Sequence, residues 1–262
     1  MNTDHTQPSP GWRGIFATLI GLFALLLIGG MQLHQSEGRQ QHQRVREQLR
    51  AVSELKAHQI SEWRNERTAD GQVAADNSFL IAAADAFLQG KSDGVALRQL
   101  MLSLKENYHY RDVMLLDAAG NLRLSLETRR TAFTEGLVDD IELAHQSHRA
   151  IQTDLHLDSE KVTPHAEIIA PLQLGQGTSL RRIGTLLLQV DPKISLLPKL
   201  GNWPQPTKTA ETLLVRRDGD QVLFLSEVHQ RSGVALIERL RRLAPWLVAV
   251  RAGGRAAAGY GD

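Results

Sequence analysis

HQSEGRQQHQRVREQLRAVSELKAHQISEWRNERTADGQVAADN, residues 34–77, is the stretch that decides the fold of this chain. It is polar and almost free of helix breakers, since only Gly38 and Gly71 interrupt it. At ~1.5 Å per residue, a helix over residues 34–69 would be ~50 Å long, which exceeds the width of one small domain. We expect a spine helix that leaves a membrane and carries sheet modules along its length. Residues recur every three or four positions as a single apolar stripe, formed by Val45, Leu49, Val52, Leu55 or Lys56, Ile60 and Trp63.

An apolar segment precedes this helix. Residues 14–33, GIFATLIGLFALLLIGGMQL, are 20 residues without a charge, which is the length needed to cross ~30 Å of hydrocarbon. A cleaved signal peptide has a shorter apolar region and a small-residue cleavage site, which is not found after Ile28. A buried core helix would need a large domain around it, and the neighbouring sequence is polar. The sequence therefore predicts an uncleaved transmembrane signal-anchor at residues 12–33, after a disordered cytoplasmic tail at residues 1–11.

The charges around this segment bear on which side of the membrane the following residues occupy. Only Arg13 precedes the span, whereas Arg39, Arg44, Arg46 and Arg50 follow it. The positive-inside rule would place the C-terminal side in the cytoplasm.

Composition excludes several functional classes. The formal net charge is +1, with basic and acidic residues interspersed, which argues against a nucleic-acid partner. The absence of cysteine excludes disulfides, zinc fingers and a cysteine nucleophile. No G-x-S-x-G or H-E-x-x-H motif occurs, so we expect neither an enzyme nor a cofactor.

After the spine helix the pattern predicts one module of mixed helices and strands at residues 78–191. Two helices come first, and a hairpin turns at Asp117–Gly120. The expected helices are Ser78–Gln89, Asp93–Asn107 and Thr134–Arg149, and the expected strands are Asp112–Asp117, Asn121–Ser125, Ala150–His156, His165–Leu172 and Ile183–Val190, with a loop at Gly175–Ser179.

A connector at residues 192–209 follows, whose four prolines prevent a single regular element. Strands Glu211–Val215 and Val222–Ser226 then flank Asp218-Gly219, a strong hairpin signal. Residues 210–262 form a second, incomplete module, with a mixture of helix and strand expected at Val234–Val250. The predicted fold class is α+β: a transmembrane helix, a long spine helix and tandem sheet modules.

This order of elements resembles the double Cache (PAS-like) extracytoplasmic sensor regions of bacterial histidine kinases and diguanylate cyclases. The stretches that carry the resemblance are Leu55–Ile60 with Trp63, Glu66 and Arg67; Asp112–Asp117; Thr153–His156; Trp203-Pro204; and Ala210–Gly219 with Val222–Leu225.

The resemblance implies a single-pass protein of the bacterial inner membrane with most of its chain in the periplasm. The first module would be membrane-distal, the second membrane-proximal, and two copies would pair through the spine helix. Relatives would continue into a second membrane helix and a kinase or cyclase domain, so the resemblance implies a chain truncated before its output domains.

A pocket for a small ligand is expected on the sheet face opposite the spine. Along His165–Leu172, strand alternation places Ala166, Ile168, Ala170 and Leu172 on one face and His165, Glu167 and Ile169 on the other. The same alternation groups Gln152, Asp154 and His156, opposite Ile151, Thr153 and Leu155. The resemblance adds Asp191, at the end of a strand where such sensors place an acid. The expected ligand-binding residues are Tyr108, Tyr110, Arg111, Asp154, His156, His165, Glu167 and Asp191.

Two other interpretations remain open. His145 and His148, with Glu142, have a spacing that could hold a metal, but no third ligand of matching pattern stands nearby, so no metal site is expected. A structural membrane protein with a coiled-coil rod and inert sheets is the alternative function, although the stripe is too irregular for three clean heptads.

Overall fold

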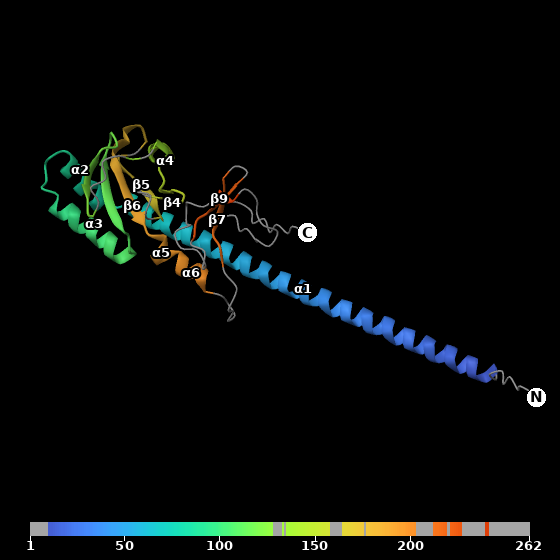
Figure 1. The fold of residues 1–262 in the computed structure, drawn as a ribbon. Coiled ribbons are helices and arrows are strands. Elements are labelled where there is room, and N and C mark those ends of the chain that lie inside the picture. Colours follow the sequence, from blue (N-terminus) through green and yellow to red (C-terminus); the bar gives the residue numbers. More distant parts are fainter. Residues whose placement is uncertain are drawn as a thin grey trace, which may run out of the picture. The chain divides into compact units, whose positions relative to one another are not determined.

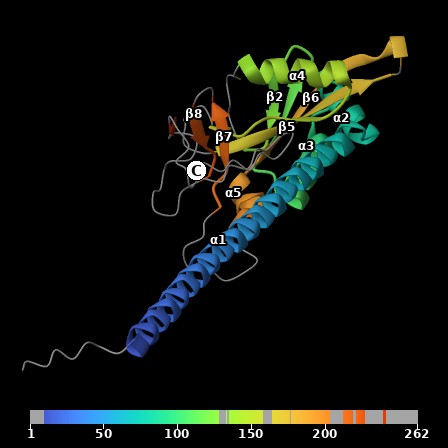
Figure 2. The same cartoon turned by 90° about the vertical axis from the view of Figure 1, so that its right-hand side faces the viewer.

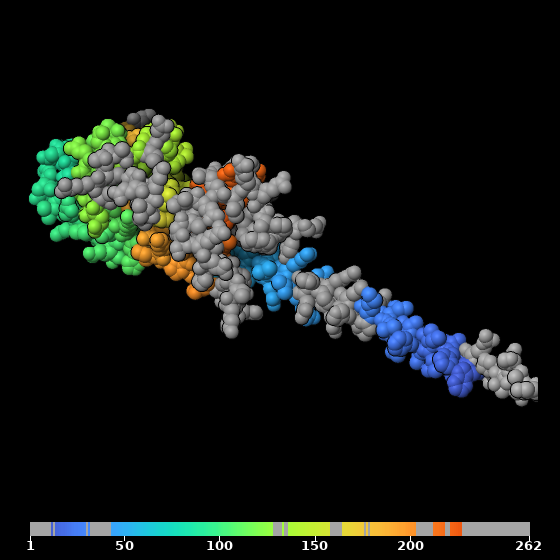
Figure 3. Space-filling model, in the orientation of Figure 1, coloured from blue at the N-terminus to red at the C-terminus, as the bar shows by residue number. Residues whose placement is uncertain are grey.

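The computed structural model describes residues 10–127, 133, 135–157, 164–175, 177–202, 212–218, 221–226 and 239–240. In Figure 3 the residues with described side chains are coloured. The chain forms two compact units, residues 1–51 and 52–262. Four predicted features lie outside the described residues: the tail up to residue 9, Trp203-Pro204, the turn at Gly219 and the segment after residue 240. The division into domains stays a prediction.

Helix α1, Pro10–Ala75, contains residues 34–75 of the spine predicted at 34–77, and it begins two residues inside the tail predicted at 1–11. Proline is favourable at a first helical position, because its missing N–H has no partner there in any case. The helix ends two residues before the predicted Asn77, because Asn77 caps the next helix and its Oδ1 accepts from the N–H groups of Phe79 and Leu80. None of the helices in the described part of the chain combines the length and apolarity needed to cross a membrane.

Two helices predicted after the spine are confirmed with small shifts at their ends, α2 at Ser78–Leu88 and α3 at Val95–Tyr108. They lead into an antiparallel sheet with the order β2-β1-β6-β5-β3, in which β4 also pairs with β5 (Figure 1). Its strands are β1 Asp112–Asp117, β2 Leu122–Ser125, β3 Ile151–Gln152, β4 His156–Leu157, β5 Pro164–Leu174 and β6 Arg181–Val190. A 3-10 turn, η1 at Gly177–Ser179, occupies part of the predicted loop.

The two faces of this sheet are covered by different helices (Figure 2). One face packs against α1, α2 and α3, and its core includes Ile168 and Ala170 of β5 with Trp63 of α1. The other packs against α4, Glu135–Ser147, with Ile169 of β5 against Ile141. The predicted alternation along β5 is therefore confirmed, and His165 and Glu167 share the face of Ile169.

The predicted strand Ala150–His156 is wrong, because the chain forms two short strands with a break between them. β3 ends at Gln152 and β4 begins at His156. At the break, Thr153 bonds to β5 through its side chain as well as its backbone: Glu167 N donates to Thr153 Oγ1, and Thr153 N donates to Glu167 O. Two-residue alternation therefore stops at this point.

The proline-containing connector begins with two short helices, α5 at Pro192–Ser195 and α6 at Leu197–Gly201. A second sheet follows, with the order β7-β8-β9. Its strands are Val215–Asp218, Gln221–Phe224 and Arg239–Leu240. The first strand of the predicted hairpin was placed too early, since the pairing begins at Val215 opposite Phe224.

Candidate functional site

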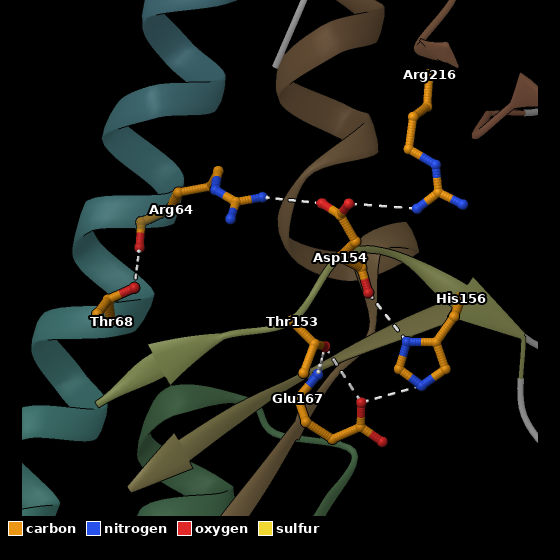
Figure 4. Close-up of polar contacts among 7 residues, drawn as sticks. All are labelled: Arg64, Thr68, Thr153, Asp154, His156, Glu167 and Arg216. Carbon is orange, nitrogen blue, oxygen red and sulfur yellow. Dashed lines mark hydrogen bonds and ion pairs between the residues drawn. The ribbon is translucent and has the colours of Figure 1, made fainter. Parts of the chain in front are cut away.

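The predicted site residues fall into separate groups. His156, His165 and Glu167 come together with Thr153, and we call these four residues the Glu167 cluster. Figure 4 shows three of them, Thr153, His156 and Glu167. Asp154 lies beside it, Tyr108 and Tyr110 lie at the end of α3, and Asp191 lies at the start of α5.

Strand pairing builds the Glu167 cluster. His156 of β4 stands opposite His165 of β5 in the register, and Glu167 is two residues further along the same face. Glu167 Oε1 lies 3.2 Å from His165 Nε2, and Oε2 lies 3.1 Å from His156 Nε2. Thr153 Oγ1 donates to Oε2 at 3.3 Å. The two imidazole rings are 4.4 Å apart between centroids.

The cluster is polar in a sheet whose other buried side chains are mainly apolar. His165 and Glu167 are fully buried, whereas the His156 side chain is 29% exposed. Burial alone would raise the pKa of Glu167, but hydrogen bonds from His156 and His165 outweigh it and hold that pKa well below its usual range. Nearby on α4, burial raises the pKa of Asp140, and the negative charges of Asp139 and Asp154 add to the effect. Asp140 and Asp154 thus place acidic side chains near the cluster, and Arg64 and Arg216 pair with Asp154.

Asp154 does not share the environment of His156, which corrects the predicted grouping of Gln152, Asp154 and His156. Its carboxylate is 64% exposed and lies 3.5 Å from Arg64 of α1 and 3.3 Å from Arg216 of β7 (Figure 4). Thr153, expected on the opposite side, reaches Glu167 instead. Because residues 153–155 are not in a strand, alternation does not hold across them.

Tyr110 belongs to the core on the α1 side of the sheet, the face opposite Glu167. Its ring stacks on Tyr108 at 6.0 Å and lies 6.0 Å from the Arg67 guanidinium. Its buried hydroxyl has no hydrogen-bond partner among the described residues. Burial, followed by the charge of Asp70, raises its pKa. Arg111 is exposed, and its backbone N–H donates to Gln189 O.

Asp191 caps α5. Its Oδ1 accepts from Lys193 N at 2.8 Å, and Pro192 occupies the first helical position. An Asp-Pro pair at this point is a common N-terminal helix signal. The sequence alone could therefore predict a capping role for Asp191. The family resemblance instead implied that Asp191 faces the ligand.

The His145/His148 pair has partners other than a metal. His145 Nε2 lies 2.9 Å from Thr185 Oγ1, and Gln173 bridges the two rings, 3.3 Å from His145 Nδ1 and 2.8 Å from His148 Nδ1. His156, His165 and Glu167 are the one group of three potential metal ligands in the described part of the chain, with donor atoms within 4.8 Å of one another. Sequence spacing could not show this, because the group depends on the pairing of β4 with β5.

No protein-family model matches the sequence, and no curated protein does. Among solved structures, the chain is similar to the ligand-binding domain of the Pseudomonas fluorescens chemoreceptor CtaA in complex with L-serine (TM-score 0.45, 14% identity, 72% of this chain and 74% of that one). It is also similar to that of the Campylobacter jejuni chemoreceptor Tlp3 in complex with L-norvaline (TM-score 0.40, 10% identity, 55% and 57%).

A third similar structure is the extracellular domain of a protein described as a histidine kinase, vpHK1S-Z8 (TM-score 0.39, 15% identity, 60% of this chain and 63% of that one). The chain spans 57% of the Tlp3 domain's length. Two of these neighbours are thus ligand-binding domains of chemoreceptors, and the third is an extracellular domain.

Proposed function

We propose that this chain is a membrane-anchored extracytoplasmic sensor that binds a small ligand at the Glu167 cluster and passes the signal on through α1. The observation that carries the proposal is a fully buried carboxylate, with two histidines and a threonine around it, in a sheet whose other buried positions are mainly apolar. A buried charge costs free energy unless it is paired or coordinates a cation. Such groups collect where a protein binds or reacts with something.

The cluster has one accessible side. His156 is partly exposed, and Asp154, Arg64 and Arg216 add exposed charges of both signs beside it. A few convergent polar groups next to apolar walls are typical of a small-ligand site. The anchor and the sheet module have no catalytic motif, so the proposed role is binding and transmission.

Anchoring in the bacterial inner membrane, with the sheets in the periplasm, is part of the proposal. It rests on the 20 uncharged residues at positions 14–33. In α1 the large apolar side chains of this stretch with described exposure are between 53% and 70% exposed, as at Phe16 and Leu25, so they need an apolar environment.

The proposal also includes the pairing of two copies of the chain through α1. Val45 and Leu49 of the predicted stripe are exposed, at 51% and 36%. This exposure also favours the alternative that the chain is a structural dimerisation rod without a ligand. The two functions differ in whether the Glu167 cluster binds anything.

The test is a thermal-shift screen of the full chain in detergent against amino acids, carboxylates and purines, with and without a chelator. Binding of a ligand at 100 times its Kd stabilises the folded state by about 2.7 kcal/mol, which corresponds to a rise of several degrees in Tm. We expect a hit whose shift is lost in Glu167→Gln.

The matched control is Glu106→Gln, which changes an exposed glutamate on α3 and should keep the shift. If no compound in a broad library raises the Tm, or if Glu167→Gln responds as the unchanged chain does, the Glu167 cluster is not the ligand site. That result would favour the alternative function, a structural dimerisation rod without a ligand.

A further inference from the structure

We infer that His156, His165 and Glu167 bind a divalent transition-metal ion of the Zn²⁺ class. This inference deepens the proposed function, because it names the chemistry of the same cluster. The ion would be the sensed species itself or the point at which a small ligand attaches.

The distances between donor atoms fit a single ion. Zn²⁺ binds imidazole nitrogen at ~2.0–2.1 Å and carboxylate oxygen at ~2.0–2.2 Å, so two donors of a tetrahedral site lie roughly 3.3–3.5 Å apart. The two nitrogen–oxygen distances are 3.1 Å from His156 to Oε2 and 3.2 Å from His165 to Oε1, so each histidine faces a different oxygen of the same carboxylate. All three donors lie within 4.8 Å of one another. Side-chain rotations that shift the donors by roughly one ångström would therefore bring all three around an ion.

The backbone holds the donors in place. His156 and His165 are a cross-strand pair, and Glu167 follows on the same face of β5. Donors on paired strands are more rigid than donors on loops, as a metal site requires.

The hydrogen bonds around the donors match those of a metal site. His156 Nδ1 lies 3.0 Å from the backbone oxygen of Asp154. A carbonyl oxygen only accepts, so Nδ1 carries the proton, and Nε2 faces the carboxylate. A histidine that donates its other N–H to a backbone carbonyl is the usual outer-shell arrangement of a metal ligand. Thr153 in turn bonds to Glu167.

The competing interpretation is an ion pair. With Nδ1 already donating, His156 can also donate from Nε2 to Glu167 only as an imidazolium. A metal ion satisfies the same three groups with both histidines neutral. Asp140 of α4, which interacts electrostatically with His156 and Glu167, favours the added positive charge. The two interpretations differ in one measurable property, since an ion pair binds no metal.

The donor set also selects the metal. Two imidazoles and one carboxylate suit Zn²⁺ and its first-row neighbours, whereas Mg²⁺ and Ca²⁺ require oxygen ligands. Three protein ligands leave a fourth position open for water or a ligand atom. That position would face the side of His156, which is 29% exposed, because His165 and Glu167 are fully buried.

The experiment uses the full chain in detergent, purified through a tag without histidine and stripped with a chelator. Zn²⁺ is titrated by calorimetry, and bound metal is counted by mass spectrometry after dialysis. We expect one Zn²⁺ per chain, a higher Tm and no response to Mg²⁺. The chain has no cysteine, so a visible Co²⁺ spectrum of tetrahedral type without a thiolate band would report histidine and carboxylate ligation directly.

The test variants are His156→Gln and Glu167→Gln, and the control is His58→Gln, which changes an exposed histidine of α1. Loss of a direct ligand should weaken Zn²⁺ binding beyond the roughly 10- to 100-fold typical of outer-shell changes, while the control keeps it. His156 is partly exposed, so its variant should fold even if changes at the buried positions do not.

Zn²⁺ binding that is absent, or equally tight in His156→Gln and the control, overturns the inference. Stoichiometric Zn²⁺ binding without any response to organic ligands would support the metal site and contradict the proposal that the chain senses a small organic molecule. If an organic ligand binds in the presence of a chelator and Zn²⁺ does not bind, the metal site is contradicted and the small-molecule sensor is supported.

Discussion

At the scale of single residues, a buried lysine of the spine helix has identifiable partners. Lys56 of the spine helix is only 2% exposed. Its ammonium donates to the backbone oxygens of Lys199 and Asn202, at the C-terminal end of α6, where carbonyls lack helical partners. Burial lowers the pKa of Lys56. A position predicted as part of the apolar stripe is thus used to attach α6 to α1.

His145 makes the stability of the fold depend on pH. Burial, helped by the positive charge of Arg182, lowers the pKa of His145 from 6.5 to about 4. Between pH 6.5 and pH 4 the unfolded chain therefore binds more protons than the folded chain. The contribution of His145 to the free energy of unfolding is thus fully present above pH 6.5 and is lost as the pH falls toward 4. The loss should be on the order of 2 kcal/mol.

Comparison with His145→Gln isolates this contribution. The unchanged chain should be the more stable at pH 8, and its advantage in Tm should shrink steadily as the pH is lowered to 4.5. Titrating groups that do not interact with His145 cancel in the difference between the two proteins, whereas its electrostatic neighbours Glu142 and His148 contribute to it. A Tm difference that stays constant over this range would show that His145 does not titrate as proposed.

Part of the candidate site could be predicted at this scale. Alternation along one strand correctly placed His165 and Glu167 on the face away from α1, since β5 is a regular strand. The same rule failed for Asp154, because a break at residues 153–155 reverses which side chains point inward.

At the scale of elements, the contact between α1 and β5 is close. A Cβ placed on Gly71 would lie 2.4 Å from Ile168 Cγ2 and 3.2 Å from the Ala150 Cβ. Ile168 is fully buried and β-branched, so it has little freedom to move. A glycine that looks like a weak point of the spine in the sequence is the residue that lets the helix approach the sheet.

Gly71→Ala should therefore destabilise the protein, by about 1–3 kcal/mol as expected for overpacking of a core, although alanine is the better helix former. Gly136→Ala is the matched control, because a Cβ on Gly136 of α4 meets nothing within 4 Å. Chemical denaturation followed by tryptophan fluorescence measures both. Equal stability of the two variants would mean that helix α1 does not pack on β5 in this way.

At the scale of the whole molecule, the proposal concerns membrane orientation and pairing. The positive-inside count favours a cytoplasmic C-terminal side, whereas the sensory role requires a periplasmic one. Leu49 lies in α1 beyond the apolar segment and is 36% exposed.

Leu49→Cys introduces the only cysteine of the chain, and it tests both points in cells. In spheroplasts, a membrane-impermeant maleimide should label it, and oxidation should yield a disulfide-linked dimer. Glu47→Cys, two residues away on the other side of the helix, should be labelled equally but cross-link much less. Absence of labelling in both variants contradicts the periplasmic orientation, and equal cross-linking contradicts pairing through the stripe.

The sequence by itself determined the elements with regular local patterns. These are the long helix through residues 34–69, the helices α2 and α3, the strand Asp112–Asp117 and the two faces of β5. Periodicity is a property of neighbouring residues, so it can be read along the chain.

Only the tertiary structure decided which side chains meet. The pairing of β4 with β5 brings His156 to His165 and Glu167, and Lys56 reaches α6 across more than a hundred residues. The physical reason is that contacts between distant segments depend on register and on breaks in the strands. Local periodicity carries no information about either.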